Sequence, residues 1–270
     1  MTKVLTPDQV AKYHGDGLLF PLPALSREEV AHFRSSHDEL DRQLGGRPTA
    51  QQKGDCHLYF KWICDLATRP AVLDAVEDII GPDILIHSST IFTKYAQDDM
   101  FVSWHQDSHY WGLSEPRLVS AWIALTDSTI DNGCLRVLTG THTRAFEHLE
   151  APQETNILSR GLTVSSGLDL DKAVDVVLRA GQMSFHHANL VHSSNSNTST
   201  GPRIGVAVRY VSTAVRQKKL HIPVILARGR DDYHHYRLQE RPTADIEEGL
   251  RLIAAQSRAS ANGERAHAHS

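Results

Sequence analysis

Hydrophobic positions in the first third of the chain recur at the spacing of amphipathic helices. A first helix is predicted after Thr6, which can form a capping box with Gln9, and a second after Ser26, which can do so with Glu29. A third apolar stripe of helical spacing ends at a Gly-Pro pair, which cannot continue a helix. The pattern therefore predicts a helical N-terminal part over residues 1–81.

Beyond this part the pattern changes to short segments rich in β-branched and aromatic residues, several of them with alternating polar and apolar positions. Polar turns containing Asn-Gly or Ala-Gly join the segments, and no helical pattern is interleaved with them. This arrangement favours an antiparallel sandwich or barrel. We expect strands within residues 83–96, 117–127, 134–142, 173–181, 182–194 and 203–211.

No internal repeat or linker divides the chain, so we expect one domain over residues 1–255. Its barrel core is predicted over residues 82–215, after the helical part. A C-terminal segment with a closing helix follows over residues 216–255. The small and polar residues 256–270 are expected to form a disordered tail.

Charge and composition restrict the partners of the protein. The 270 residues carry a formal net charge of −4 and no long basic run, so neither a nucleic acid nor an anionic membrane is expected as a partner. No signal peptide and no apolar run of about 20 residues is present. Three cysteines without a C-x-x-C pair are typical of free thiols in a reducing compartment, which predicts a cytoplasmic protein. The partner is expected to be a small molecule, and the oligomeric state is not readable.

The stretch "SWHQDSHYW" contains a possible pair of metal ligands, His105 and Asp107. In a strand, residues two apart point to the same face, so one imidazole and one carboxylate would converge. Non-haem Fe(II) oxygenases bind their metal with two histidines and one carboxylate. The pair alone is a weak signal, because the chain has 17 histidines and most of them need no metal.

A third ligand would have to come from another predicted strand. The segment "FHHANLVHSS" offers His186, His187 and His192. Of these, His192 is followed eleven residues later by an arginine, Arg203. The other two histidines are expected to support the site or the core.

These residues together resemble the phytanoyl-CoA dioxygenase family of Fe(II)- and 2-oxoglutarate-dependent oxygenases. The resemblance rests on "WHQD", on "AWIALTDSTIDNGCLRVLTGTH", on "GQM" before the distal histidine, and on the arginine eleven residues after it. It extends from Leu5 to Tyr210. It implies a mainly β fold with flanking helices, built on a double-stranded β-helix (jelly-roll, cupin-like) core, and the use of Fe(II), 2-oxoglutarate and O2.

The resemblance also implies roles for individual residues. His105, Asp107 and His192 would hold the metal. Arg203 would bind the far carboxylate of 2-oxoglutarate, for which the two-pronged guanidinium is better suited than an ammonium. The resemblance also assigns Trp122 and Gln106 to the cosubstrate, although a core role is an equal alternative for the tryptophan.

The strand that begins at Arg203 predicts a ligand-lined face. Arg203, Gly205, Ala207 and Arg209 alternate on one face, and the small residues would leave room for a ligand between the arginines. Ile204, Val206, Val208 and Tyr210 face the other way and read as core. The candidate substrate-pocket residues are Tyr110, Trp111, Arg209, Arg216, Lys94 and Tyr95.

The expected reaction is hydroxylation of an unactivated C–H bond of a small anionic or zwitterionic molecule, such as a phosphonate or an amino-acid derivative, with release of succinate and CO2. Related halogenases carry Ala or Gly where this chain has Asp107, which favours hydroxylation. Desaturation or cyclisation at the same site and hydroxylation of an acyl-CoA are alternatives. A non-redox metal-dependent cupin enzyme and a non-enzymatic binding barrel are further ones.

Overall fold

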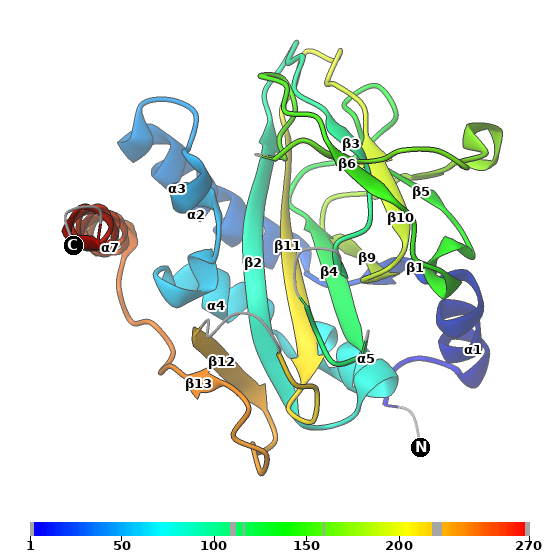
Figure 1. The fold of residues 1–270 in the computed structure, drawn as a ribbon, viewed down its shortest axis with the longest axis horizontal. Coiled ribbons are helices and arrows are strands. Elements are labelled where there is room, and N and C mark those ends of the chain that lie inside the picture. The colour runs from blue at the N-terminus through cyan, green and yellow to red at the C-terminus, as the bar shows by residue number, and fades with distance from the viewer. Residues whose placement is uncertain (1–2, 109–111, 116, 159, 218–222, 268–270) are drawn as a thin grey trace.

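The fold is built around two sheets that enclose an inner core, with most helices on one side and α1 on the other (Figure 1). This computed structural model describes residues 3–108, 112–115, 117–158, 160–217 and 223–267, with side chains as far as Arg258. The expected mainly β fold with flanking helices and a jelly-roll core is confirmed.

The helices predicted from the sequence form where their caps place them. Thr6 and Gln9 make the predicted capping box, and Ser26 and Glu29 make the second one. The corresponding helices are α1 (Pro7–Asp16) and α2 (Arg27–Leu44), and the third apolar stripe forms α5 (Pro70–Ile80). Five short helical elements of the described chain were not predicted: α3 (Ala50–Lys53), η1 (Cys56–Leu58), α4 (Lys61–Ala67), η2 (Thr141–Thr143) and η3 (Leu170–Lys172).

The prediction of a wholly helical N-terminal part is wrong at one place. The segment "LLFPLP" forms strand β1 (Leu18–Pro23), which pairs with β9 at the edge of the larger sheet. Two prolines remove two ladder donors, which only an edge strand tolerates. The N-terminal part therefore contributes to the barrel as well as covering it.

The larger sheet has seven strands in the order β1-β9-β4-β11-β2-β12-β13. All neighbours pair antiparallel except β12 and β13, which are parallel. Besides β1, its strands are β2 (Ile84–Lys94), β4 (Leu118–Ala124), β9 (Gln182–His187), β11 (Arg203–Ser212), β12 (Pro223–Arg228) and β13 (Arg237–Leu238).

The smaller sheet faces the inner side of the larger one and has the order β3-β10-β5-β8. Its strands are β3 (Val102–His105), β5 (Leu135–Leu138), β8 (Val174–Val176) and β10 (Val191–Ser194). A separate hairpin consists of β6 (His148–Glu150) and β7 (Leu162–Val164), and η3 (Leu170–Lys172) precedes β8.

The two faces of the larger sheet have different surroundings. As predicted from the alternation, Ile204, Val206, Val208 and Tyr210 belong to the outer core, which the helices cover. Tyr210 also donates its hydroxyl proton to the Ala67 carbonyl at 2.7 Å and so ties β11 to α4. The opposite, inner face of β11 is therefore left for the interior of the barrel.

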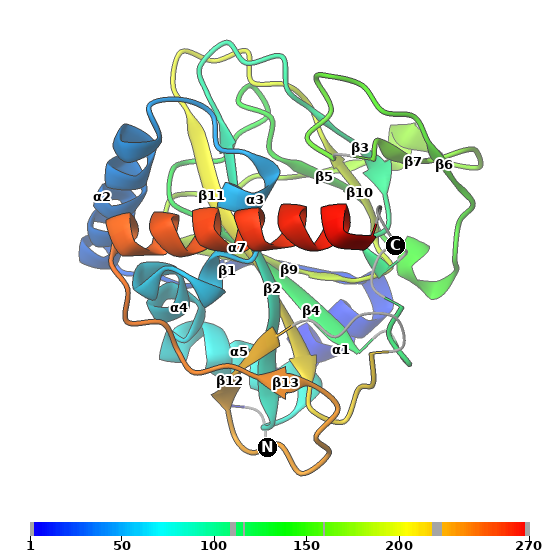
Figure 2. The ribbon, with the colours of Figure 1, turned by 60° about the vertical axis from the view of Figure 1, so that its left-hand side comes forward.

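The C-terminal segment differs from its prediction. Strand β12 pairs with β2, so the larger sheet continues beyond the expected core boundary at residue 215. Helix α7 (Ile246–His267) crosses beside α2 and α3 (Figure 2) and includes most of the tail that was expected to be disordered. Residues 256–270 include four alanines and two arginines, whose high helix propensity favours continuation of the helix.

The free cysteines expected from the sequence are present in the structure. Cys56, Cys64 and Cys134 are buried and free. Among the described residues, none of the helices combines the length and the apolar character that crossing a bilayer requires.

Candidate metal centre and active site

A cavity with an empty volume of about 480 Å³ lies inside the barrel, between the inner faces of the two sheets. Histidines, one aspartate and two arginines make up its polar wall, and aliphatic and aromatic side chains complete it. The lining residues are Phe92, Val102, His105, Asp107, Trp122, Leu135, Leu158, His186, His192, Ser193, Ser194, Arg203, Ala207 and Arg209.

The structure brings the three predicted metal ligands together. His105 ends β3 and pairs in register with His192 on β10. One ligand atom each of His105, Asp107 and His192 lies within 4.8 Å of the other two, and within the described parts of the chain this is the one such group. The strand argument holds for His105 alone, because β3 ends there and the following turn returns Asp107 to the same point.

Backbone hydrogen bonds fix the orientation of both histidines. The His105 Nδ1 lies 2.9 Å from the carbonyl of Ser103, and the His192 Nδ1 lies 2.9 Å from that of Leu190. A carbonyl can only accept, so each Nδ1 carries the proton and each Nε2 keeps its lone pair. Each Nε2 is thereby left available as a metal ligand.

The charge state of the group suits a divalent cation. Burial raises the pKa of Asp107, but the guanidinium of Arg209 and the neighbouring His105 outweigh this and hold the pKa well below its usual range. Burial lowers the pKa of His192 well below its usual value, so this imidazole is neutral. Asp107 Oδ2 is buried without a hydrogen bond. An ionised carboxylate with an unused oxygen beside the neutral imidazole of His192 provides donors that suit a divalent metal.

His186 stands next to this group but is not part of it. Its ring centroid lies 4.8 Å from that of His192, and its Nε2 lies 4.0 Å from Asp107 Oδ2. Burial lowers the pKa of His186 to about 4, so it is neutral. His187 points elsewhere, and its Nδ1 accepts a hydrogen bond from the Asn189 amide at 3.0 Å.

Arg203 provides a buried cation in the wall of the same cavity. It is 2% exposed, and it donates to the Gly133 carbonyl at 2.6 Å. Its Nε is buried without a hydrogen-bond partner. Its guanidinium carbon lies 5.2 Å from the centroid of the Trp122 ring, which also lines the cavity. An arginine held in this way can bind a carboxylate.

The space that was expected at Gly205 is filled by protein, whereas Ala207 lines the cavity as expected. A Cβ added at Gly205 would overlap the indole of Trp122. The glycine therefore accommodates the tryptophan, and the interpretation that it leaves room for a ligand is wrong.

Two predicted site residues have their side chains outside the cavity. The Gln106 amide donates to the carbonyls of Arg144 and Asn189 and accepts from the Phe146 amide at 2.9 Å, so it joins loops instead of meeting a cosubstrate. Arg216 is exposed, and its backbone pairs with that of Ser114. The positions of Gln106 and Arg216 along the sequence do not indicate where their side chains lie in the fold.

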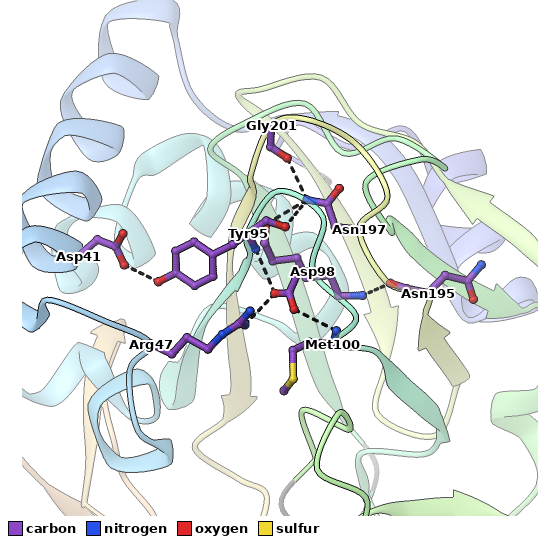
Figure 3. A network of polar contacts seen from close by, with 9 residues as sticks. Asp41, Arg47, Tyr95, Asp98, Met100, Asn195, Asn197 and Gly201 are labelled. Carbon is purple, nitrogen blue, oxygen red and sulfur yellow. Dashed lines mark hydrogen bonds and ion pairs between the residues drawn. The ribbon is translucent and has the colours of Figure 1, made fainter.

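The remaining substrate-pocket predictions have three different outcomes. Tyr95 donates its hydroxyl proton to Asp41 at 2.5 Å (Figure 3) and does not line the cavity. Lys94 is completely buried behind the cavity wall and does not line it. Tyr110 and Trp111 lie outside the described residues.

Some lining residues were not predicted. Ser194 is two residues after His192 on β10, and strand alternation could have identified it. Val102 and Leu158 come from segments whose side of the cavity depends on tertiary packing, and no sequence signal identifies them.

Comparison with known proteins identifies the family. The model of the phytanoyl-CoA dioxygenase family matches residues 4–205. The chain belongs to the phytanoyl-CoA dioxygenase family. Its expected class, an iron- and 2-oxoglutarate-dependent dioxygenase, is thereby confirmed.

Relatives in this family act on different molecules. The ectoine dioxygenase of Bordetella bronchiseptica is 25% identical over 77% of this chain and 76% of its own length. The L-proline trans-4-hydroxylase of Streptomyces griseoviridis is 25% identical over 75% of this chain and 85% of its own length. Among solved structures, the non-heme monooxygenase ThoJ superposes with a TM-score of 0.78 at 28% identity, covering 93% of this chain and 100% of its own.

Proposed function

We propose that this dioxygenase hydroxylates a C–H bond of a small anionic or zwitterionic molecule. In this proposal Fe(II) is held by His105, Asp107 and His192, and the distal carboxylate of 2-oxoglutarate is held by Arg203. The observation that supports it is the convergence of three metal-type donors and one buried, incompletely paired arginine on a single cavity.

The residues have separable tasks in this reaction. Bound iron and 2-oxoglutarate supply the oxidative chemistry, in which O2 is consumed and succinate and CO2 are released. The Nδ1 hydrogen bonds of the two histidines keep their Nε2 atoms directed at one point. Trp122 and the aliphatic lining exclude water from that point.

The charge of the cavity supports an anionic group on the substrate. Among the described lining residues, two arginines stand against one aspartate, and His186 and His192 are neutral. The charges of Fe(II) and of the 2-oxoglutarate dianion cancel. One positive charge therefore remains for the substrate, and Arg209 is the residue that carries it. Ectoine, L-proline and hypophosphite, which appear in the names of relatives, are small charged molecules.

A substrate panel tests this proposal. Phosphonates, amino-acid derivatives and acyl-CoA esters are incubated with enzyme, Fe(II), 2-oxoglutarate and O2, and succinate release and the gain of one oxygen atom are measured. We expect substrate-dependent succinate with a small charged compound. Turnover of acyl-CoA esters alone would contradict the substrate class, and product formation without 2-oxoglutarate would favour the non-redox cupin alternative.

Variants test the ligand assignment. Asp107→Ala is expected to abolish hydroxylation, because it removes the only carboxylate of the group. Asp99→Ala is the matched control, since Asp99 is exposed and outside the cavity. A wild-type rate of substrate-dependent succinate formation in Asp107→Ala would show that the assignment is wrong.

A further inference from the structure

Lys94, the last residue of β2, is completely buried, and none of the ion pairs between described residues includes its ammonium group. Lysines are seldom fully buried unless they are paired. Lys94 Nζ instead donates to Ser194 Oγ at 2.7 Å and to the Asn195 carbonyl. The carboxylate of the adjoining loop, Asp98, pairs with Arg47 at 2.7 Å (Figure 3). Within the described parts of the chain, no direct ion pair therefore compensates the charge of Lys94.

A second buried cation lies beside it. Lys94 stands directly opposite Arg203 in the register of β2 and β11, so both side chains start from the same face of the sheet. The charged and titratable groups that face Lys94 are Arg203, Asp98 and Cys134. Burial, followed by Arg203, lowers the pKa of Lys94 to about 6, while Asp98 and Cys134 act in the opposite direction.

Ser194 connects this lysine with the cavity. Ser194 lines the cavity, and its Oγ accepts a hydrogen bond from Nζ of Lys94, which does not line it. A neutral amine can accept the hydroxyl proton of a serine, whereas an ammonium can only donate. Once Lys94 is protonated, the Ser194 proton must therefore turn to another acceptor, and the cavity is where an anionic acceptor would be.

We propose that Lys94 is a positioning residue for the distal carboxylate of the cosubstrate, which it reaches through the hydroxyl of Ser194 while Arg203 binds the same carboxylate directly. The inference rests on the proposed function, since it assumes that 2-oxoglutarate binds with this carboxylate at Arg203. It adds to the anion site a second interaction, which depends on the protonation of Lys94.

Binding and protonation are then linked. Without an anion Lys94 is largely neutral near pH 7.5, and a carboxylate at Ser194 stabilises its charged form. Binding of 2-oxoglutarate should therefore draw protons from the buffer onto the Lys94 nitrogen. A lysine that only fixed the turn at Asn195 would produce no such uptake.

Anaerobic calorimetry of 2-oxoglutarate binding to the Fe(II)-loaded enzyme measures this uptake. The apparent binding enthalpy is compared at pH 7.5 in buffers of different ionisation enthalpy. We expect proton uptake in the wild type and its loss in Lys94→Met, together with a Kd raised roughly tenfold to a hundredfold. Lys94→Arg should bind nearly as well as the wild type but without proton uptake, because arginine is always charged.

Controls separate this inference from a folding defect and from the proposed function. Lys61→Met changes an exposed lysine on α4 and should match the wild type. If Lys94→Met does not fold, Ser194→Ala serves in its place and should weaken binding and reduce proton uptake. Equal uptake and equal Kd in the folded Lys94 or Ser194 variants and the wild type would overturn the inference. Failure of the wild type to bind 2-oxoglutarate at all would overturn the proposed function and this inference with it.

Discussion

Arg209 lines the cavity, as the sequence predicted, but its contact with Asp107 was not predicted. It was expected to meet a polar group of the substrate. Its Nε lies 3.7 Å from Asp107 Oδ2, and its NH1 donates to Thr90 Oγ1 at 2.8 Å. The guanidinium therefore also steadies the carboxylate that would hold the metal. Such supporting partners of metal ligands commonly tune the site.

Gly205 gives a residue-scale prediction. Gly205→Ala forces the Trp122 indole out of its place beside β11, because the added Cβ would overlap it. Overpacking of this kind costs about 1–3 kcal/mol of the free energy of unfolding. We expect a lower midpoint in urea and weaker 2-oxoglutarate binding, since Trp122 also packs on Arg203.

The matched control is Gly201→Ala, where an added Cβ would meet nothing within 4 Å. It should leave both measurements unchanged. Unaltered stability and cosubstrate affinity in Gly205→Ala would show that Trp122 does not depend on this glycine.

At the scale of elements, the loop between β10 and β11 determines how His192 and Arg203 are spaced. Asn197 in this loop is 1% exposed, and its Nδ2 donates to the carbonyls of Tyr95 at 2.8 Å and Gly201 at 2.9 Å (Figure 3). It thereby joins the end of β2 to the start of β11. The hydrogen bonds of Asn197 therefore hold this loop against both strands.

Asn197→Ala should consequently destabilise both the fold and the anion site. The carbonyls of Lys94, Tyr95 and Gly201 lose a donor, which costs about 2–4 kcal/mol of the free energy of unfolding. Urea unfolding measures this, and calorimetry should show weaker 2-oxoglutarate binding. Asn195→Ala, at an exposed side chain of the same loop, is the control. A change no larger than that of the control would contradict the role of Asn197.

What could be predicted from the sequence depended on the range of the interactions involved. The capping boxes at Thr6 and Ser26 and the alternation along β11 are local, so the pattern alone predicts them. The amide of Gln106 is turned away by loops that approach only in the folded chain. The direct opposition of Lys94 and Arg203 likewise depends on a strand register that no local pattern encodes.

At the scale of the whole molecule, the larger sheet separates an apolar core under the helices from a polar interior. Polar groups also occur in the buried layer. His57 and His87 are 0% and 1% exposed. Burial, then His87, lowers the pKa of His57 to about 3, and burial, then Arg209, lowers that of His87 to about 4.

The lowered pKa values of His57 and His87 predict that the folded protein loses stability in mild acid. In the unfolded chain their pKa is near 6.5, so below this pH the unfolded state binds more protons than the folded state. The stability that these neutral histidines contribute is fully present above pH 6.5 and is lost as the pH falls towards 4. At pH 5 the loss is roughly 2 kcal/mol for each histidine.

Urea unfolding of metal-free protein at pH 7.5 and pH 5 measures this effect. His57→Gln should reduce the difference between the two pH values, whereas His14→Gln, at an exposed position, should not. A pH difference unchanged by His57→Gln would show that His57 is not the source.

The central claim is that the His105–Asp107–His192 group and Arg203 form one site for Fe(II) and 2-oxoglutarate. The most direct test is an anaerobic titration of the protein with Fe(II) and 2-oxoglutarate, followed by visible absorbance. The account predicts a metal-to-ligand charge-transfer band in the wild type. It also predicts that His192→Ala abolishes the band and that Arg203→Lys requires roughly tenfold or more 2-oxoglutarate to reach it. Absence of the band in the wild type at saturating Fe(II) and 2-oxoglutarate would contradict the account.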